Sequence, residues 1–203
     1  SFLETLLNLL LSLLVRRKIK TQFGGNLIAF VSGGGPLDSQ IGNTLNALGI
    51  KTLQGYGLTE TSPVVSCNPL TNIKVETVGT VLPNVEVKLA EDGEILVRGE
   101  ILMIGYWNNK EATDEIIRDG WLHTGDIGVF DSDNYLIITD RKKDIIVSSG
   151  GDNISPSKLE NLLTLDAKIE QACVFGDNKS YISALLVINP QENSNKNEIQ
   201  NYI

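Results

Sequence analysis

The sequence of 203 residues predicts a mixed α/β protein, from three successive patterns along the chain. The first is a strand, a glycine loop, a helix and a second strand, which together make a βαβ unit. The second is a pair of alternating hairpins, typical of a small antiparallel barrel or sheet. The third is a strand, a helix and two further strands, which indicate a smaller α+β domain. A boundary near Lys142 divides the chain into residues 1–141 and 142–203.

An apolar run at residues 6–15 comes first, and the basic residues follow it rather than precede it. Ten residues are too few to span a bilayer, and a secretory signal would carry its basic residues on the other side. We therefore expect a buried helix whose basic end complements the helix dipole. A helix lying on a membrane surface is the alternative.

The βαβ unit begins with a short apolar run at residues 27–31, which leads into Gly33, Gly34 and Gly35. Apolar residues then recur at helical spacing, and residues 51–54 lead into a second glycine pair. Two strands joined by a crossover helix pair in parallel, so we expect a parallel, right-handed unit.

The hairpins of the second pattern alternate apolar and polar residues on each side of a short turn. One hairpin joins residues 85–89 to 94–98, and the other joins residues 127–130 to 135–139. The third pattern predicts a strand at 145–148, a helix at 156–165, and strands at 169–175 and 181–189. The polar residues 191–203 predict a loosely ordered tail.

Composition excludes several classes of protein. The net charge of −8 disfavours nucleic acid as a partner, because phosphates repel an acidic chain. Two cysteines give no disulfide framework and fit a reducing, cytoplasmic compartment. The single histidine, His123, excludes a zinc site that needs several imidazoles. No acidic partner for His123 lies in its own motif, so we expect a structural or surface role for it.

Residues 54–62 carry the most informative local motif. Tyr56 stands between Gly55 and Gly57, where its ring can lie against a planar ligand while the backbone approaches closely. The hydroxyl of Thr59 can bond a phosphate, and the carboxylate of Glu60 can hold Mg²⁺. The alternative is a capped helix start, with Thr59 or Thr61 as the cap.

Two further segments suit a nucleotide. Residues 119–126 end with Asp126 at a Thr-Gly turn, where a carboxylate suits the paired hydroxyls of a ribose. An Asx turn with Trp121 in the core is the alternative. The charged residues 140–144 precede Gly150 and Gly151, and Arg141 could clamp a ribose or phosphate there. A solvated charged face is the alternative in that segment.

In this order, these segments resemble the adenylate-forming, AMP-binding superfamily, and most closely its long-chain fatty acyl-CoA synthetases. The resemblance covers residues 24–189. It rests on residues 32–37, 54–62, 93–99, 105–107, 119–126, 140–144 and 148–156. It implies that residues 1–141 are the C-terminal part of the large AMP-binding domain, and that residues 142–203 are the hinge and the start of a small C-terminal domain.

The resemblance also implies a reaction and its residues. A fatty acid and ATP give acyl-AMP and pyrophosphate, and coenzyme A then displaces AMP. Thr59, Glu60 and Lys143 are the implied catalytic residues, with Glu60 on Mg²⁺ and Lys143 at the hinge. ATP or AMP is implied to bind at Gly33, Gly34, Gly35, Tyr56, Gly57, Thr59, Asp126 and Arg141, with Tyr56 stacked on the adenine. Gly150 and Gly151 are implied to line the pantetheine path.

The sequence departs from the family pattern in two places. The phosphate loop with its lysine and the C-terminal catalytic lysine are both absent from these residues. We therefore expect a fragment that does not make acyl-AMP alone. The alternatives are a fatty acyl-AMP ligase or other adenylation domain with a carrier-protein acceptor, and a non-catalytic nucleotide-binding remnant. The expected location is cytoplasmic, with peripheral membrane contact as the alternative.

Overall fold

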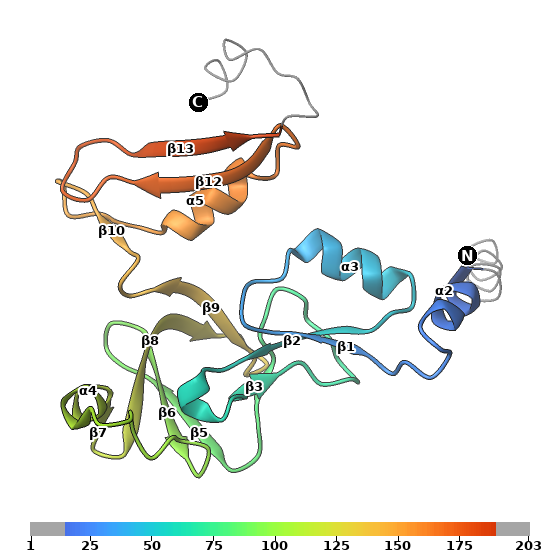
Figure 1. Cartoon of the computed structure of the whole chain (residues 1–203), viewed down its shortest axis with the longest axis horizontal. Helices are drawn as coiled ribbons and strands as arrows, with labels where there is room; N and C mark the ends of the chain where they lie inside the picture. Colours follow the sequence, from blue (N-terminus) through green and yellow to red (C-terminus); the bar gives the residue numbers. More distant parts are fainter. Residues whose placement is uncertain (1–14, 190–203) are drawn as a thin grey trace. The chain divides into compact units, whose positions relative to one another are not determined.

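The computed structural model describes residues 15–189 and divides the chain into two compact units (Figure 1). One unit ends at Thr139 and the other begins at Asp140. The apolar run at residues 6–15 lies outside the described residues except for Val15, and the polar tail at 191–203 lies outside them entirely. The predicted α/β class is confirmed, since both units combine helices and sheets.

The βαβ unit forms as predicted at the start of the first unit. The elements are α2 (Arg17–Gln22), β1 (Phe30–Ser32), α3 (Ser39–Ala47) and β2 (Thr52–Tyr56). β1 and β2 pair in parallel, and α3 begins where the carboxylate of Asp38 accepts a hydrogen bond from the Ile41 N–H at 2.9 Å. Two short strands extend the sheet: β3 (Ser66–Cys67) pairs antiparallel with β2, and β4 (Thr80–Val81) pairs antiparallel with β3.

A five-stranded sheet takes the place of the predicted hairpins. It contains β5 (Val85–Leu89), β6 (Glu94–Gly99), β7 (Ile117–Arg118), β8 (Trp121–Phe130) and β9 (Leu136–Arg141). The β5–β6 hairpin is confirmed, and β9 pairs with β8. The motif analysis did not predict α4 (Lys110–Ile116), which is capped by the Asn109 side chain.

The core of the first unit joins its two sheets. Val65, Val78, Ile95, Val97 and Leu136 are buried against one another, and the ring of Tyr56 packs against this cluster. The cluster draws on β6 and β9 of the second sheet and on the residues just before β3 and β4 of the first. Burying such side chains contributes about 1.5–3 kcal/mol each. Tyr56 is therefore anchored where the two sheets meet.

The second unit is a small α+β structure, as predicted. A short hairpin, β10 (Ile146–Val147) and β11 (Asn153–Ile154), precedes α5 (Pro156–Leu163). α5 packs against β12 (Ile169–Phe175), which pairs antiparallel with β13 (Ser183–Ile188). The helix ends two residues before the predicted end at 165. Thr164 is its C-cap residue, and the Thr164 hydroxyl donates a hydrogen bond to the Glu160 carbonyl.

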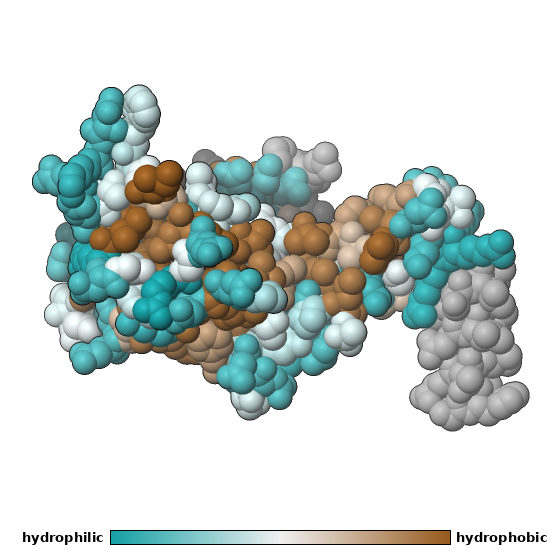
Figure 2. Space-filling model, turned by 90° about the horizontal axis from the view of Figure 1, so that it is seen from below, coloured by the Kyte–Doolittle hydropathy of each residue, from teal (hydrophilic) through white to brown (hydrophobic). Residues whose placement is uncertain are grey.

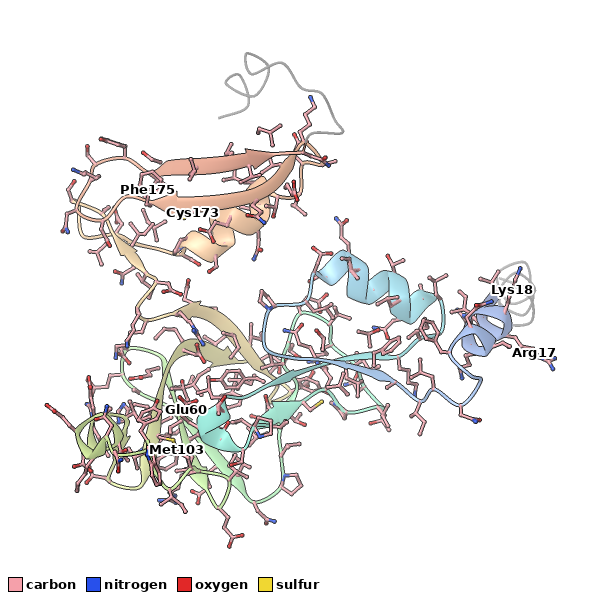
Figure 3. The ribbon with its side chains drawn as sticks, in the orientation of Figure 1. Arg17, Lys18, Glu60, Met103, Cys173 and Phe175 are labelled. Carbon is pink, nitrogen blue, oxygen red and sulfur yellow. The ribbon has the colours of Figure 1, made fainter. Side chains whose placement is uncertain are left out.

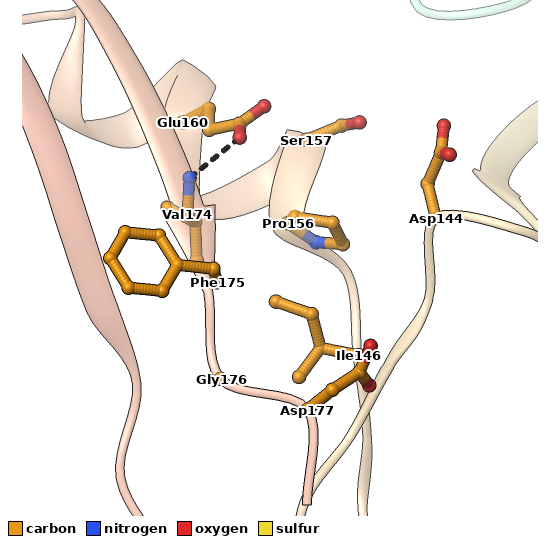
Figure 4. Close-up of a pocket in the computed structure, with 9 residues that line it drawn as sticks. All are labelled: Asp144, Ile146, Pro156, Ser157, Glu160, Val174, Phe175, Gly176 and Asp177. Carbon is orange, nitrogen blue, oxygen red and sulfur yellow. Dashed lines mark hydrogen bonds between the residues drawn. The ribbon is translucent and has the colours of Figure 1, made fainter. Parts of the chain in front are cut away.

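A hollow of about 360 Å³ lies within the second unit, between the start of α5 and the end of β12 (Figure 4). Its lining contains three carboxylates, from Asp144, Glu160 and Asp177. Two of these already accept backbone hydrogen bonds: Glu160 from the Val174 N–H at 2.8 Å, and Asp177 from the Val147 N–H at 3.0 Å. These bonds tie α5 and β10 to β12 and to the turn that follows it.

The surface carries large apolar side chains among the polar ones (Figure 2). The most exposed are Ile104 and Trp107, which flank Gly105 and Tyr106. Among residues 15–189, no helix is both long enough and apolar enough to cross a membrane.

Candidate functional site

Two of the predicted ligand-binding residues, Tyr56 and Asp126, meet in the first unit. Tyr56 ends β2 and Asp126 lies in β8, seventy residues later in the chain. The Tyr56 hydroxyl donates to the Asp126 carboxylate at 2.7 Å, and Asp126 is only 3% exposed. The bond links the two sheets and places a flat ring beside a carboxylate. That pairing fits a nucleoside, which presents a planar base and two ribose hydroxyls.

Asp126 does not lie at the entrance of a strand, as its Thr-Gly turn predicted. It lies inside β8, because an irregularity in the pairing with β6 absorbs the turn and lets the strand continue. The alternative role of Trp121 as a core residue is also wrong. Its ring is half-buried and is contacted by two cations. The ammonium nitrogen of Lys88 lies 4.1 Å from the ring centroid, and the guanidinium carbon of Arg98 lies 4.6 Å from it.

The glycines of the first unit differ in the space around them. Within the described residues, and apart from each glycine and its two chain neighbours, no atom lies within 4 Å of the point where a Cβ would stand on Gly34 or Gly35. Gly34 has a φ of +81°. Their open backbone fits the close approach of a flat ligand. A Cβ on Gly33 would lie 3.6 Å from the Gly55 carbonyl oxygen, so the loop borders β2. Gly57 is enclosed instead, since its Cβ would lie 1.7 Å from the Pro63 carbonyl oxygen.

Glu60 lies in η2 (Thr59–Thr61), a single helical turn after β2. Its backbone carbonyl accepts a hydrogen bond from the Met103 N–H at 2.8 Å, which holds the two segments together (Figure 3). The Tyr106 hydroxyl donates to its Oε1 at 2.7 Å, and this hydrogen bond raises the pKa of Tyr106. The carboxylate is half-buried, and the bond from Tyr106 involves its Oε1 atom.

This arrangement fits Mg²⁺ held by one carboxylate. Residues 15–189 contain no group of three or more His, Cys, Asp or Glu side chains placed so that they could hold one metal ion. Mg²⁺ in nucleotide sites needs no such group, since it is bound through one or two carboxylates together with waters and substrate phosphates. Thr59 is exposed beside Glu60, where a phosphate could reach its hydroxyl. The alternative with Thr59 or Thr61 as the cap is wrong, because Leu58 occupies the N-cap position. Thr61 is fully buried at the third residue of the turn, where its hydroxyl oxygen accepts a hydrogen bond from the Leu58 N–H at 2.9 Å.

The remaining predicted residues belong to the second unit. Arg141 ends β9, and Lys143 lies in an exposed turn closed by the Asp144 N–H, which donates to the Arg141 carbonyl at 3.0 Å. Gly150 and Gly151 form the turn between β10 and β11. Gly151 has a φ of +87°, and among residues 15–189 only its own chain neighbours lie near its Cβ position.

Sequence reasoning missed three side chains near these residues. Tyr106 bonds Glu60, and Glu94 contacts His123 at 3.3 Å, which gives the histidine an acidic partner from another strand. Gln54 precedes Tyr56 by two residues, on the same face of β2. Among residues 15–189, the buried Oε1 of Gln54 has no hydrogen-bond donor. A bound ligand with an N–H or O–H group could supply one.

The chain matches two families of known proteins. Residues 2–107 match the family described as AMP-binding enzyme, and residues 143–203 match the AMP-binding enzyme C-terminal domain. The long-chain-fatty-acid–CoA ligase FadD15 of Mycobacterium bovis is 46% identical over 178 residues, which are 88% of this chain and 30% of the relative. A long-chain-fatty-acid–CoA ligase of Salmonella typhimurium is 37% identical over 182 residues, 83% of this chain and 32% of the relative.

Solved structures show the same fold. The o-succinylbenzoate CoA synthetase MenE of Bacillus subtilis, in complex with its acyl-adenylate intermediate, superposes with a TM-score of 0.76 at 26% identity. That match covers 92% of this chain and 42% of MenE. MenE in complex with ATP and magnesium gives a TM-score of 0.72 at 29% identity, over 85% of this chain and 38% of MenE. The chain thus spans about 30% of the length of its curated relatives, and it belongs to the AMP-binding enzyme family.

Proposed function

We propose that this chain is the part of an ATP-dependent long-chain fatty acid–CoA ligase that binds the adenosine and Mg²⁺ portion of the substrate and carries the hinge. The observation that carries the proposal is the hydrogen bond between Tyr56 and Asp126, because it joins a ring for the base and a carboxylate for the ribose in one place. The names and identities of the relatives support long-chain fatty acids as the substrate class.

In the proposed site, the ring of Tyr56 stacks on the adenine, and the open backbone of Gly34 and Gly35 borders the same base. Asp126 and Arg141 bind the ribose, and Thr59 bonds a phosphate. Gly33 and Gly57 shape the two loops that hold these groups. Glu60 holds Mg²⁺, which when bound neutralises phosphate charge.

The first proposed step joins the fatty acid to AMP. A carboxylate oxygen of the fatty acid attacks the α-phosphorus of ATP, and the bond to pyrophosphate breaks. Such a transfer depends on positioning and charge neutralisation more than on covalent help. The anchored Tyr56 and the buried Asp126 hold the adenosine end, so that the reacting phosphorus is presented in one orientation.

The second proposed step transfers the acyl group to coenzyme A. The thiol sulfur attacks the acyl carbon, and AMP leaves. Rotation of the backbone at Lys143 exchanges the two half-reactions, and the turn at Gly150 and Gly151 lines the pantetheine path. The exposure of Lys143 and the open space at Gly151 support these roles. Cys67 and Cys173 are unpaired, which supports the proposed cytoplasmic location.

The test is acyl-CoA formation by the full protein that carries this chain, with ATP, Mg²⁺, coenzyme A and fatty acids of graded length. We expect turnover with long-chain acids, and a rise of about 10- to 100-fold in the KM for ATP in Asp126→Asn, because hydrogen bonds to charged groups contribute about 1.5–3 kcal/mol. Asp119→Asn is the matched control, since Asp119 is exposed and its φ of +51° suits asparagine equally.

An unchanged KM for ATP in Asp126→Asn would overturn the ribose assignment. Acyl-AMP that accumulates without thioester would move the proposal to an enzyme with a carrier-protein acceptor. ATP binding without turnover of any acid would identify a non-catalytic nucleotide-binding protein.

A further inference from the structure

A β-bulge lies directly before Asp126 in β8. Leu96 of β6 faces His123, and Glu94 faces Ile127, so two steps along β6 correspond to four along β8. The extra residues include Gly125, whose φ of +73° is a conformation that other residues rarely adopt. Bulges of this kind bend a strand and redirect the side chains beside it, at the cost of regular ladder bonds.

The carboxylate of Glu94 takes over the bonding that the bulge disrupts. Glu94 is 6% exposed, and its Oε1 accepts a hydrogen bond from the Gly125 N–H at 3.0 Å. Its Oε2 lies 3.3 Å from Nδ1 of His123. Both carboxylate oxygens therefore contact residues immediately before Asp126, one on each side of Thr124.

Thr124 completes the support of the bulge. Its hydroxyl donates to the Ile95 carbonyl at 2.8 Å and accepts from the Asp126 N–H at 3.1 Å. A buried backbone N–H that lost its acceptor would cost about 1–3 kcal/mol, so these bonds determine the path that the bulge takes. The side chain of Asp126 then reaches the Tyr56 hydroxyl at 2.7 Å.

We infer that Glu94 is a positioning residue for the ribose. It stabilises the bulge at Gly125, and the bulge orients the carboxylate of Asp126 toward the ribose hydroxyls. Glu94 acts through Asp126 and does not touch the nucleotide. The inference rests on the proposed function, because it takes Asp126 as the ribose ligand. A carboxylate that shifts by a fraction of an ångström loses the geometry of a hydrogen bond.

The test compares ATP with two deoxy analogues in the full protein that carries this chain. Steady-state kinetics of adenylation are measured with ATP and with its 2′-deoxy and 3′-deoxy analogues, for the wild type and for Glu94→Ala. We expect the wild type to prefer ATP by about tenfold or more over at least one deoxy analogue. Glu94→Ala should raise the KM for ATP about tenfold, leave the KM for that analogue nearly unchanged, and so abolish the preference.

Two further variants separate positioning from folding. Glu94→Gln keeps an oxygen that can accept from the Gly125 N–H, and its preference should stay within about threefold of the wild type. Glu94→Asp keeps the charge but withdraws the oxygens by one methylene, so it should lose most of the preference even if Glu94→Ala fails to fold. Glu86→Ala is the matched control, because Glu86 is an exposed carboxylate on the neighbouring strand that pairs with Arg98.

Equal loss of activity with ATP and with the deoxy analogue, in Glu94→Asp or Glu94→Ala, would overturn the inference, because a general structural defect does not depend on a ribose hydroxyl. A wild type that distinguishes neither analogue from ATP would overturn the role of Asp126 itself. The two failures are therefore distinguishable: the first leaves Asp126 standing as the proposed ribose ligand, and the second does not.

Discussion

The predicted ligand-binding residues of the two units differ in how firmly they are held. In the first unit, Tyr56, Asp126 and Glu60 each form a side-chain hydrogen bond with a residue from a distant part of the chain. In the second unit, the turn at Gly150 and Gly151 is closed by local bonds, such as the Gly151 N–H donating to the Ser148 carbonyl at 2.9 Å. The first arrangement is pre-organised for binding, whereas the second can change its backbone at low cost.

Two glycines show the same contrast. Gly57 has no room for a methyl group, because the Pro63 carbonyl oxygen would lie 1.7 Å from it. Gly151 faces open space, and only its φ of +87° opposes a side chain. The glycine of the first unit is thus required by packing, and that of the second by backbone conformation alone.

The largest expected effect comes from a substitution that disrupts the packing around Gly57. Gly57→Ala should lower the free energy of unfolding by about 3 kcal/mol or more, because the methyl group must displace the backbone at Pro63. Urea denaturation of the full protein, followed by circular dichroism, measures the change. Nucleotide binding should be lost with it, since Gly57 lies between Tyr56 and Glu60 and Pro63 follows Glu60 by three residues.

Gly35→Ala is the matched control for Gly57→Ala. In the part of the chain that the structure describes, Gly35 has only its chain neighbours within 4 Å of its Cβ position, and its φ is not positive. The free energy of unfolding of Gly35→Ala should therefore stay within about 0.5 kcal/mol of the wild type. Equal stability of the two variants would contradict the packing assigned to Gly57.

Regular patterns of the sequence predicted most of the fold. Alternation identified β5 and β6, and helical spacing after the glycine loop identified α3. The ten-residue length of β8 was not predicted, because Thr124 and Gly125 are typical of a turn. The carboxylate that keeps them within a strand comes from Glu94, about thirty residues earlier. The short strands β3 and β4 depend on pairing between distant residues, and no local pattern shows it.

The candidate site was predicted only as separate motifs. Neither motif alone shows that Tyr56 meets Asp126, because their contact depends on how two sheets pack. Tyr106 and Glu94 were missed for the same reason, since their partners lie 46 and 29 residues away in the chain. A sequence pattern with a short period cannot encode such distances. The assignments of individual residues to adenine, ribose, Mg²⁺ and pantetheine remain predictions.

A smaller effect should come from stiffening the second unit. Lys143→Pro fixes φ at one exposed turn residue and restricts Lys142 before it. We expect thioester formation to slow about tenfold more than adenylation, since a conformational penalty of about 1.4 kcal/mol gives a factor of ten. Pyrophosphate exchange and single-turnover acyl-CoA formation measure the two half-reactions separately.

Lys143→Ala separates the backbone from the side chain at this position. It removes the ammonium group but leaves φ free, so the ratio of the two half-reactions should stay within about twofold of the wild type. An equal loss of both half-reactions in Lys143→Pro would argue against a hinge at this residue.

The smallest effect tests a single bond of the first unit. The Tyr106 hydroxyl occupies one oxygen of Glu60, so Tyr106→Phe should free it and lower the Mg²⁺ concentration for half-maximal adenylation about two- to threefold. Glu60 raises the pKa of Tyr106 above its ordinary value near 10. The bond is therefore present at lower pH and is lost only as pH rises through the raised pKa. The effect should accordingly be constant between about pH 6 and 9.

Tyr181→Phe, at an exposed tyrosine of the second unit, is the control for Tyr106→Phe. A higher Mg²⁺ requirement in Tyr106→Phe would instead show that the phenol orients Glu60 toward the cation and does not compete with it.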